Sequence, residues 1–206
     1  MAAETRRARE KAMRRRELLD AAKRMFAQKG YAATTIDEIA QEADFSKGAM
    51  YGYFEGKEDL FFSLIQEKLD DIERRSRRVI ESSDDPKSKI MDLVETHLAF
   101  FEEDKDFFRI IVSEQPRLEM EAENRLREHL GERCLRGLDL IEKVMQDGVS
   151  AGVLKEIDPR FLATGLVGII HAFTAQWILL GGEEGLMERK SVILELFLNG
   201  AEVALT

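Results

Sequence analysis

The sequence contains few of the residues that build covalent cross-links, metal clusters and irregular loops. Its 206 residues include one cysteine, three histidines and three prolines. A single thiol cannot form an intramolecular disulfide or a cysteine-based metal cluster. The histidines stand far apart, at positions 97, 129 and 171, so we expect no metal site and no bound cofactor. The scarcity of proline and the lack of strand-like alternation favour an all-α chain.

The sequence also lacks the short motifs of common enzyme sites. It has no HExxH motif, no glycine-rich nucleotide loop after a strand and no serine nucleophile motif. His97 falls on an apolar helical stripe, where a buried structural histidine is commoner than a catalytic base. We therefore expect a protein that is not an enzyme. The alternative is a helical enzyme, or a helical adaptor that does not bind DNA.

Export and membrane signals are weak. No apolar stretch directly follows the basic N-terminus, so the sequence predicts no secretory signal and a cytoplasmic location. One run, Phe161 to Gly182, lacks Asp, Glu, Lys and Arg over 22 residues, which is long enough to cross a bilayer. It also contains four glycines, Thr164, His171 and Gln176. This composition favours a helix covered on all sides by protein, and no membrane partner.

The net charge of −9 is unevenly distributed along the chain. Residues 1–35 contain ten lysines and arginines against four aspartates and glutamates. The rest of the chain is therefore strongly acidic. Such asymmetry indicates that the basic N-terminal part binds a polyanion.

Capping signals divide the first sixty residues into short helices. An apolar stripe that includes Leu18 and Phe26 ends at Gly30, a glycine suited to the end of a helix. Thr35 and Glu38 then have the spacing of a capping box, and Ser46 is placed to cap a third, shorter helix. Two short helices joined by a tight turn and packed on a longer one predict a helix-turn-helix motif over residues 35–54.

Two lysines stand where the helix dipole disfavours them. Lys47 and Lys57 each begin a helix, although a cation in the first turn opposes the macrodipole. Free N–H groups together with a lysine form a phosphate site. Together with Tyr51 and the basic N-terminus, they indicate DNA binding.

The stretch from Arg15 to Leu64 resembles the DNA-binding domain of the TetR/AcrR family of bacterial transcriptional repressors. The order and spacing of many short segments are those of the family. The matching segments are Leu18-Leu19-Asp20-Ala21-Ala22, Phe26, Lys29-Gly30-Tyr31, Ala33-Thr34-Thr35-Ile36, Glu38-Ile39-Ala40, Ser46-Lys47-Gly48, Tyr51, Tyr53-Phe54 and Lys57-Glu58-Asp59-Leu60.

The resemblance implies a ligand-responsive regulator, most simply a dimeric repressor that a small hydrophobic molecule releases from a palindromic operator. It places the helix beginning near Ser46 in the major groove, with Lys47 at base edges or phosphates. Gly52 stands where the family often has an aromatic residue, so the operator sequence does not transfer. The residues expected to contact DNA are Thr35, Ser46, Lys47, Gly48, Tyr51, Tyr53 and Lys57.

The rest of the chain reads as a larger helical domain. We expect domains at 1–56 and 57–206 and about nine helices in all. A two-fold dimer is expected because one short recognition helix reads too few base pairs. The predicted dimer interface combines the uncharged helix with the last one. Its residues are Leu162, Leu166, Ile169, Ile170, Phe173, Ile193, Leu196, Phe197, Gly200 and Ala204.

The resemblance also implies an effector pocket in the second domain. Four phenylalanines lie within nine residues, and a few polar groups stand nearby, which is the composition of a ligand pocket. The acidic residues around the phenylalanines favour a cationic or neutral amphiphile over a carboxylate. The predicted lining residues are His97, Phe100, Phe101, Phe107, Phe108, Phe173, Gln176 and Trp177.

Overall fold

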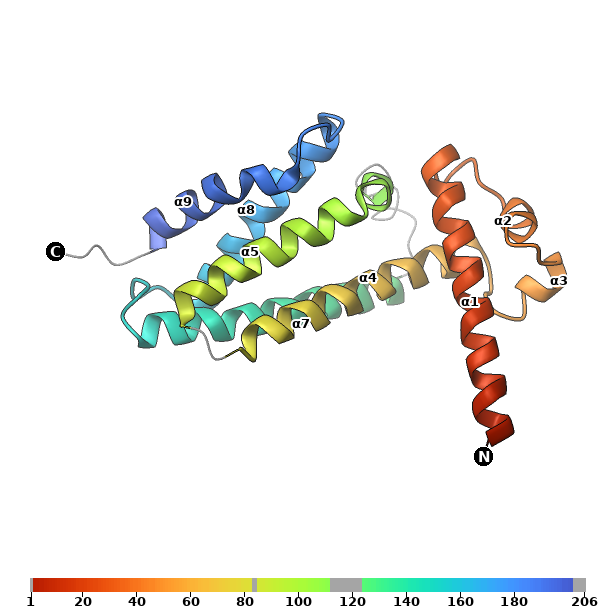
Figure 1. Ribbon diagram of the computed structural model, residues 1–206, viewed down its shortest axis with the longest axis horizontal. Helices are drawn as coiled ribbons and strands as arrows, with labels where there is room; N and C mark the ends of the chain where they lie inside the picture. The colour runs from red at the N-terminus through yellow and green to blue at the C-terminus, as the bar shows by residue number, and fades with distance from the viewer. Residues whose placement is uncertain (1, 83–84, 112–123, 202–206) are drawn as a thin grey trace. The chain divides into compact units, whose positions relative to one another are not determined.

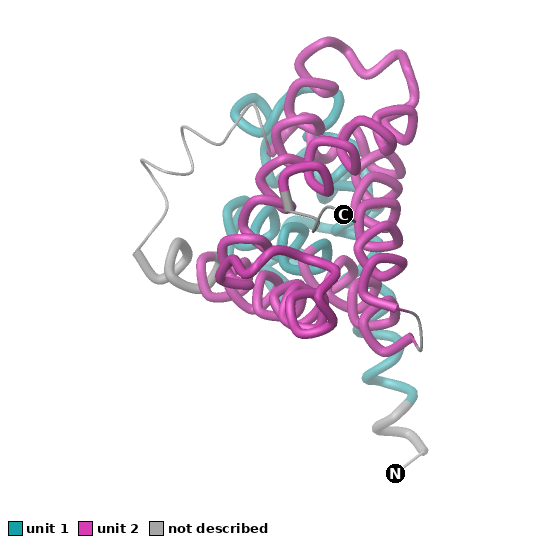
Figure 2. The backbone as a smooth tube through the Cα atoms, turned by 90° about the vertical axis from the view of Figure 1, so that its left-hand side faces the viewer, with its two compact units in different colours: residues 1–68 teal, residues 69–206 magenta. Residues whose placement is uncertain are grey.

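The computed structural model describes the backbone of residues 2–82, 85–111 and 124–201, and the side chains of residues 6–82, 85–111 and 131–200. Every regular element in these ranges is a helix (Figure 1), which confirms the predicted all-α fold. The chain forms two compact units, residues 1–68 and 69–206 (Figure 2). The boundary falls inside one helix. Residues 57–68, which the sequence assigned to the second domain, belong to unit 1 in the structure.

Unit 1 contains three helices and the first turns of a fourth. They are α1 (Ala2–Lys29), α2 (Ile36–Glu42), α3 (Lys47–Met50) and α4 (Lys57–Ile80). All four contribute buried apolar side chains, including Leu18 of α1, Ile39 of α2 and Met50 of α3. Phe26 of α1 and Phe61 of α4 meet edge to face, with ring centroids 5.5 Å apart. Such a contact adds about 0.5–1.5 kcal/mol beyond its buried area, so α4 is anchored in unit 1.

Two left-handed residues set the turns of unit 1. Gly30 has φ +80° directly after α1, as expected for a glycine at a helix end. Asp44 has φ +58° in the turn between α2 and α3, a conformation that aspartate tolerates better than most residues. The next amide, that of Phe45, donates to the Ala40 carbonyl at 2.8 Å. These turns aim α3 away from α2 at an angle that the local sequence determines.

Unit 2 begins inside α4 and consists of longer helices. They are α5 (Pro86–Glu103), a helical stretch over residues 105–111, α7 (Asn124–Ser150), α8 (Pro159–Leu179), the 3-10 helix η1 (Leu186–Arg189) and α9 (Lys190–Ala201). Helix α8, in which Arg160 of the first turn is the one charged residue, packs against α5, α7 and α9. Its buried residues, such as Leu166 and Ile170, join Leu93 of α5 and Met145 of α7 in the core.

Helix α8 is not covered on all sides, as its composition had suggested, because a second apolar face is exposed in the part of the chain that the structure describes. Phe161 is 71 % exposed and Leu179 is 74 % exposed, and between them lie Gly165, Gly168 and Ala172, which are also exposed. These five positions recur at helical spacing on one side of α8. The helix is long and apolar enough to cross a membrane, but a core helix passes the same test, and 39 % of its most apolar stretch is buried.

Candidate functional site

Helix α3 presents a small polar surface to solvent. Ser46 caps its N-terminus, since the Ser46 side chain accepts a hydrogen bond from the Ala49 amide at 3.2 Å. Lys47, Gly48 and Tyr51 are all exposed. A Cβ added at Gly48 would meet no atom within 4 Å, although glycine inside a helix costs about 1 kcal/mol relative to alanine. The packing of unit 1 therefore does not require this glycine, and the space beside it is open.

Lys47 is held by an acidic residue of the neighbouring helix. Its ammonium lies 2.8 Å from Oδ1 of Asp37 at the start of α2. The hydrogen bond that Lys47 donates to the Asp37 carboxylate raises the pKa of Lys47 above its ordinary value. Both side chains are about 60 % exposed, so Lys47 can replace Asp37 with another anion at low cost. The sequence did not predict this role of Asp37, because a carboxylate in the first turn of a helix is already explained by the helix dipole.

The two tyrosines of the motif differ in their surroundings. Tyr51, at the end of α3, is 52 % exposed and free to reach a partner. Tyr53 is half-buried, and its ring meets that of Phe45 edge to face at 6.1 Å. Phe45 comes directly before Ser46, so Tyr53 also steadies the start of α3. The structure therefore gives Tyr53 a packing role in addition to the DNA contact expected from sequence.

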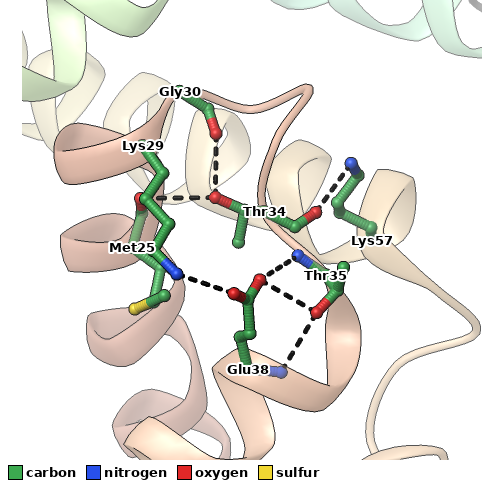
Figure 3. Close-up of polar contacts among 7 residues, drawn as sticks. All are labelled: Met25, Lys29, Gly30, Thr34, Thr35, Glu38 and Lys57. Atoms are coloured by element: carbon green, nitrogen blue, oxygen red, sulfur yellow. Dashed lines mark hydrogen bonds and ion pairs between the residues drawn. The ribbon is translucent and has the colours of Figure 1, made fainter.

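The Thr35 hydroxyl is already used inside the fold (Figure 3). It accepts from the Glu38 amide at 3.3 Å and donates to Glu38 Oε2 at 2.9 Å, while the Thr35 amide donates to the same oxygen. This is the predicted capping box. Lys29 also donates to Glu38, at 2.6 Å. These hydrogen bonds, that of Lys29 foremost, lower the pKa of Glu38 to about 2, so the cap stays charged at neutral pH.

Lys57 is a structural cation in this arrangement. Its ammonium donates to the carbonyl oxygens of Tyr31 at 2.9 Å, Ala32 at 3.3 Å and Thr34 at 2.9 Å, and it lies 4.4 Å from the centre of the Tyr31 ring. Thr34 is buried, and its hydroxyl donates to the Gly30 carbonyl at 2.8 Å. Lys57 thus ties the start of α4 to the loop between α1 and α2 (Figure 3), whereas the sequence suggested a phosphate contact.

In unit 2 the predicted phenylalanines form one aromatic cluster. Phe101 and Phe108 lie 4.6 Å apart, and Phe100 lies 5.1 Å from Phe108. Phe107 contacts Phe108 at 5.5 Å, and His171 of α8 meets Phe101 edge to face at 5.7 Å. Phe100 and Phe107 are almost fully buried, whereas Phe101 and Phe108 are half-buried. The half-buried pair therefore forms the accessible part of the cluster.

His97 is buried and neutral. Its Nδ1 lies 2.8 Å from the Leu93 carbonyl, so Nδ1 carries the proton and Nε2 is left as an acceptor. Burial, together with a smaller effect of nearby His171, lowers the pKa of His97 to about 4. The neutral ring thus donates from Nδ1 within its own helix, and Nε2 is its acceptor.

The remaining predicted lining residues lie on α8 with unequal exposure. Trp177 is buried, and its indole N–H donates to the Glu184 carbonyl at 2.6 Å. Gln176 is exposed and accepts a hydrogen bond from Arg189, so it points away from the core. Phe173 is half-buried against the core. Sequence reasoning missed Thr174, whose buried hydroxyl oxygen has no hydrogen-bond partner among the residues the structure describes.

The predicted dimer residues divide between core and surface. Leu162, Leu166, Ile170, Ile193 and Phe197 are at most 5 % exposed within the single chain. They pack in the core of unit 2, so a second subunit cannot reach them. The sequence showed two apolar faces on one uncharged helix, and only packing decides which of them is covered. Of the others, Ile169 and Phe173 are half-buried, Leu196 and Gly200 are exposed, and Ala204 lies outside the described residues.

Comparisons with known proteins cover nearly the whole chain. The sequence profile of bacterial regulatory proteins of the tetR family matches residues 18–64, and that of the tetracyclin repressor-like C-terminal domain matches residues 83–201. The fatty acid metabolism regulator protein of Bacillus subtilis is 26 % identical over 186 residues, which are 89 % of this chain and 93 % of that protein. Relatives of this kind are transcriptional regulators and not enzymes.

Solved structures agree with the sequence profiles. The fatty acid degradation regulator FadR from Bacillus halodurans superimposes with a TM-score of 0.79 at 25 % identity, covering 91 % of this chain and 95 % of that one. FadR from Bacillus subtilis in complex with stearoyl-CoA gives 0.76 at 25 % identity, covering 89 % and 97 %. With both domain profiles matched, and the second spanning more than half of its length, the chain belongs to the TetR family of DNA-binding transcriptional regulators.

Proposed function

We propose that this regulator is a dimeric repressor that a long-chain fatty acyl-CoA releases from a palindromic operator. The observation that carries the proposal is its likeness, over about nine-tenths of the chain, to regulators of fatty acid metabolism, one of them solved with stearoyl-CoA. The contacts within each unit support a role for particular residues in each step.

Operator binding rests on the exposed surface of α3. When DNA binds, Lys47 leaves Asp37 and contacts the DNA. A phosphate or an acceptor on a base edge then takes the place of the Asp37 carboxylate. Tyr51 reaches the backbone, and Gly48 lets it come close to α3. Thr35 and Ser46 act as helix caps that fix the starts of α2 and α3. Lys57 holds the loop before α2 and so positions the motif.

Dimerisation uses the open face of α8, which we define as Phe161, Gly165, Gly168, Ala172 and Leu179. Helix α9, which packs on α8, also exposes the apolar side chains of Leu196 and Val192. Small residues at the centre of the open face allow two copies of α8 to approach closely. An uncharged surface of this kind is costly in water and is covered in stable homodimers. This face replaces the buried residues predicted from the sequence.

The effector binds at the aromatic cluster of unit 2. Phe101 and Phe108 offer apolar contact to an acyl chain, while Thr174 and Nε2 of His97 offer the few polar groups that orient a ligand. Cations of the same unit offset much of the acidic charge nearby, since Lys190 pairs with Glu95 and Arg109 pairs with Asp106. Glu103 accepts two hydrogen bonds from Arg75 at 2.9 and 2.7 Å, and Glu102 accepts from the Leu186 amide at 2.7 Å.

The proposal is tested by operator release. The full-length protein first selects its operator from fragments of the source genome, and binding is then followed by fluorescence anisotropy. Palmitoyl-CoA should dissociate the complex, whereas free coenzyme A and octanoyl-CoA should not. By linkage, operator must weaken palmitoyl-CoA binding by the same factor, which the fluorescence of Trp177, the only tryptophan, would report. Selection of no enriched sequence would refute operator binding, and release by none of the acyl-CoAs would refute the effector.

A further inference from the structure

The N-terminal half of α1 carries a basic face that the helix-turn-helix motif does not use. Between Leu18 and Phe26 the inward face of α1 is apolar and buried. Continued toward the N-terminus at the same helical spacing, this face holds Arg14, Lys11 and Arg7, all exposed. Figure 1 shows this half of α1 running on past α2 and α3. The same face of α1 is therefore buried in the C-terminal half of the helix, whereas in the N-terminal half it is cationic and exposed.

The charge of this segment is unbalanced. Residues 6–16 contain seven lysines and arginines and a single acidic residue, Glu10. Glu10 pairs with Arg6 at 3.0 Å. Neither Arg7 nor Lys11 forms an ion pair with any side chain that the structure describes. Like charges three or four residues apart destabilise a helix, so the segment is suited to a polyanion that relieves this repulsion.

The basic face is directed toward the start of the recognition helix. The Arg14 guanidinium lies 5.6 Å from the centre of the Phe45 ring, and Phe45 directly precedes Ser46, the N-cap of α3. From Arg14 to Arg7 the helix advances about 10 Å at 1.5 Å per residue. That distance equals about three base pairs of duplex, at 3.4 Å each.

We propose that Arg7, Lys11 and Arg14 form a second DNA-binding surface, which holds phosphates of the operator beyond the bases that α3 reads. The inference rests on operator binding by α3 but adds a contact outside the helix-turn-helix motif. It extends the site on each half of the palindrome without adding sequence preference, because phosphates carry no base information.

The test compares two double variants with equal loss of charge. In Arg7→Gln/Lys11→Gln the basic face is removed, while Arg14 is kept because it contacts Phe45. The control Arg9→Gln/Arg16→Gln removes two exposed cations from the opposite side of α1. Binding of each protein is measured on two duplexes over a range of salt concentrations. One duplex is a minimal operator selected by the wild type, and the other is the same operator with five further base pairs at each end.

On the longer duplex we expect the Arg7/Lys11 variant to bind about tenfold or more weakly than the control. Its salt dependence should fall by about 1.8 in log–log slope per protomer, the value for two lost phosphate contacts. On the minimal duplex the two variants should bind alike. Equal effects of both variants on both duplexes, or no effect of either, would overturn the proposal. Failure of the wild type to select any operator would instead refute the proposed function.

Discussion

The two units of this regulator place their candidate sites in opposite environments. In unit 1 the residues proposed to meet DNA are exposed, and short-range contacts such as the Thr35–Glu38 capping box hold them. In unit 2 the residues proposed to meet the effector are buried or half-buried and come from helices far apart in sequence, as His97 of α5 and Thr174 of α8 do. The exposed polar side chains of the first site can exchange partners at low cost. The buried polar groups of the second site are either hydrogen-bonded or lower the stability of the fold by lacking a partner. The first site suits reversible DNA binding, and the second suits a ligand that changes packing.

The largest expected effect concerns the open face of α8. Ala172→Glu places a charge at its centre, which the single chain tolerates because Ala172 is exposed. Burying an unpaired charge costs about 3–5 kcal/mol, so the dimer dissociation constant should rise at least a hundredfold, and operator binding should fall with it. Sedimentation equilibrium measures the first effect. Gln146→Glu, an exposed position of α7, is the control, and an unchanged dimer in Ala172→Glu would remove α8 from the interface.

The next effect is a loss of stability at low pH that buried His97 causes. The pKa of His97 is lowered from 6.5 to about 4, so the folded state disfavours its charged form. Its contribution to stability is complete above pH 6.5 and is lost progressively as the pH falls toward 4. The loss amounts to about 3 kcal/mol at 1.36 kcal/mol per pKa unit. Urea unfolding at pH 7 and pH 4.5 should show a larger loss for the wild type than for His97→Leu. Equal losses would contradict burial of the neutral ring.

A third effect tests whether Lys57 belongs to the fold or to the DNA surface. Lys57→Met removes the hydrogen bonds to the carbonyls of Tyr31, Ala32 and Thr34. We expect unit 1 to lose about 2 kcal/mol of stability without any DNA present, since hydrogen bonds of charged groups contribute about 1.5–3 kcal/mol. Thermal unfolding followed by circular dichroism checks this. Unchanged stability with weaker binding to every duplex would mean that Lys57 contacts phosphate.

A smaller effect concerns the unsatisfied hydroxyl of unit 2. Thr174→Val replaces it with a methyl group of similar shape. Stability should stay constant or rise by about 1 kcal/mol, because a buried hydroxyl without a partner is costly. Palmitoyl-CoA should bind more weakly if the hydroxyl orients the ligand. A loss of stability in the variant, measured by urea unfolding, would show that Thr174 has a partner within the protein.

The smallest effect concerns the pair of Lys47 and Asp37. Asp37→Asn frees Lys47 and removes a negative charge beside the DNA surface. We expect operator affinity to increase a few-fold, in line with the 0.2–1 kcal/mol typical of exposed ion pairs. The gain should shrink at high salt, because screening weakens exposed charges. Anisotropy titrations at two salt concentrations measure both effects. Weaker binding by Asp37→Asn would indicate that the carboxylate positions Lys47 for DNA.

Much of unit 1 could be predicted because its signals are local. The capping box, the Ser46 cap and the left-handed Asp44 each depend on residues within a few positions of one another. The partners of Lys47 and Lys57 could not be predicted in the same way. Lys47 meets a residue ten positions away, and Lys57 meets carbonyls more than twenty positions away. Such contacts exist only once the helices have packed.

Sequence alone determined the helical fold, the helix-turn-helix motif and the family, because caps, turns and apolar spacing act over one or two helical turns. It also showed that the run from Phe161 to Gly182 carries no charged residue. Only the tertiary structure decided which side of α8 is core and which is open, since the lack of charge on a helix does not say which of its faces other helices cover. For the same reason, packing alone showed that Lys57 is held by backbone carbonyls and that Thr174 is buried without a partner among the described residues.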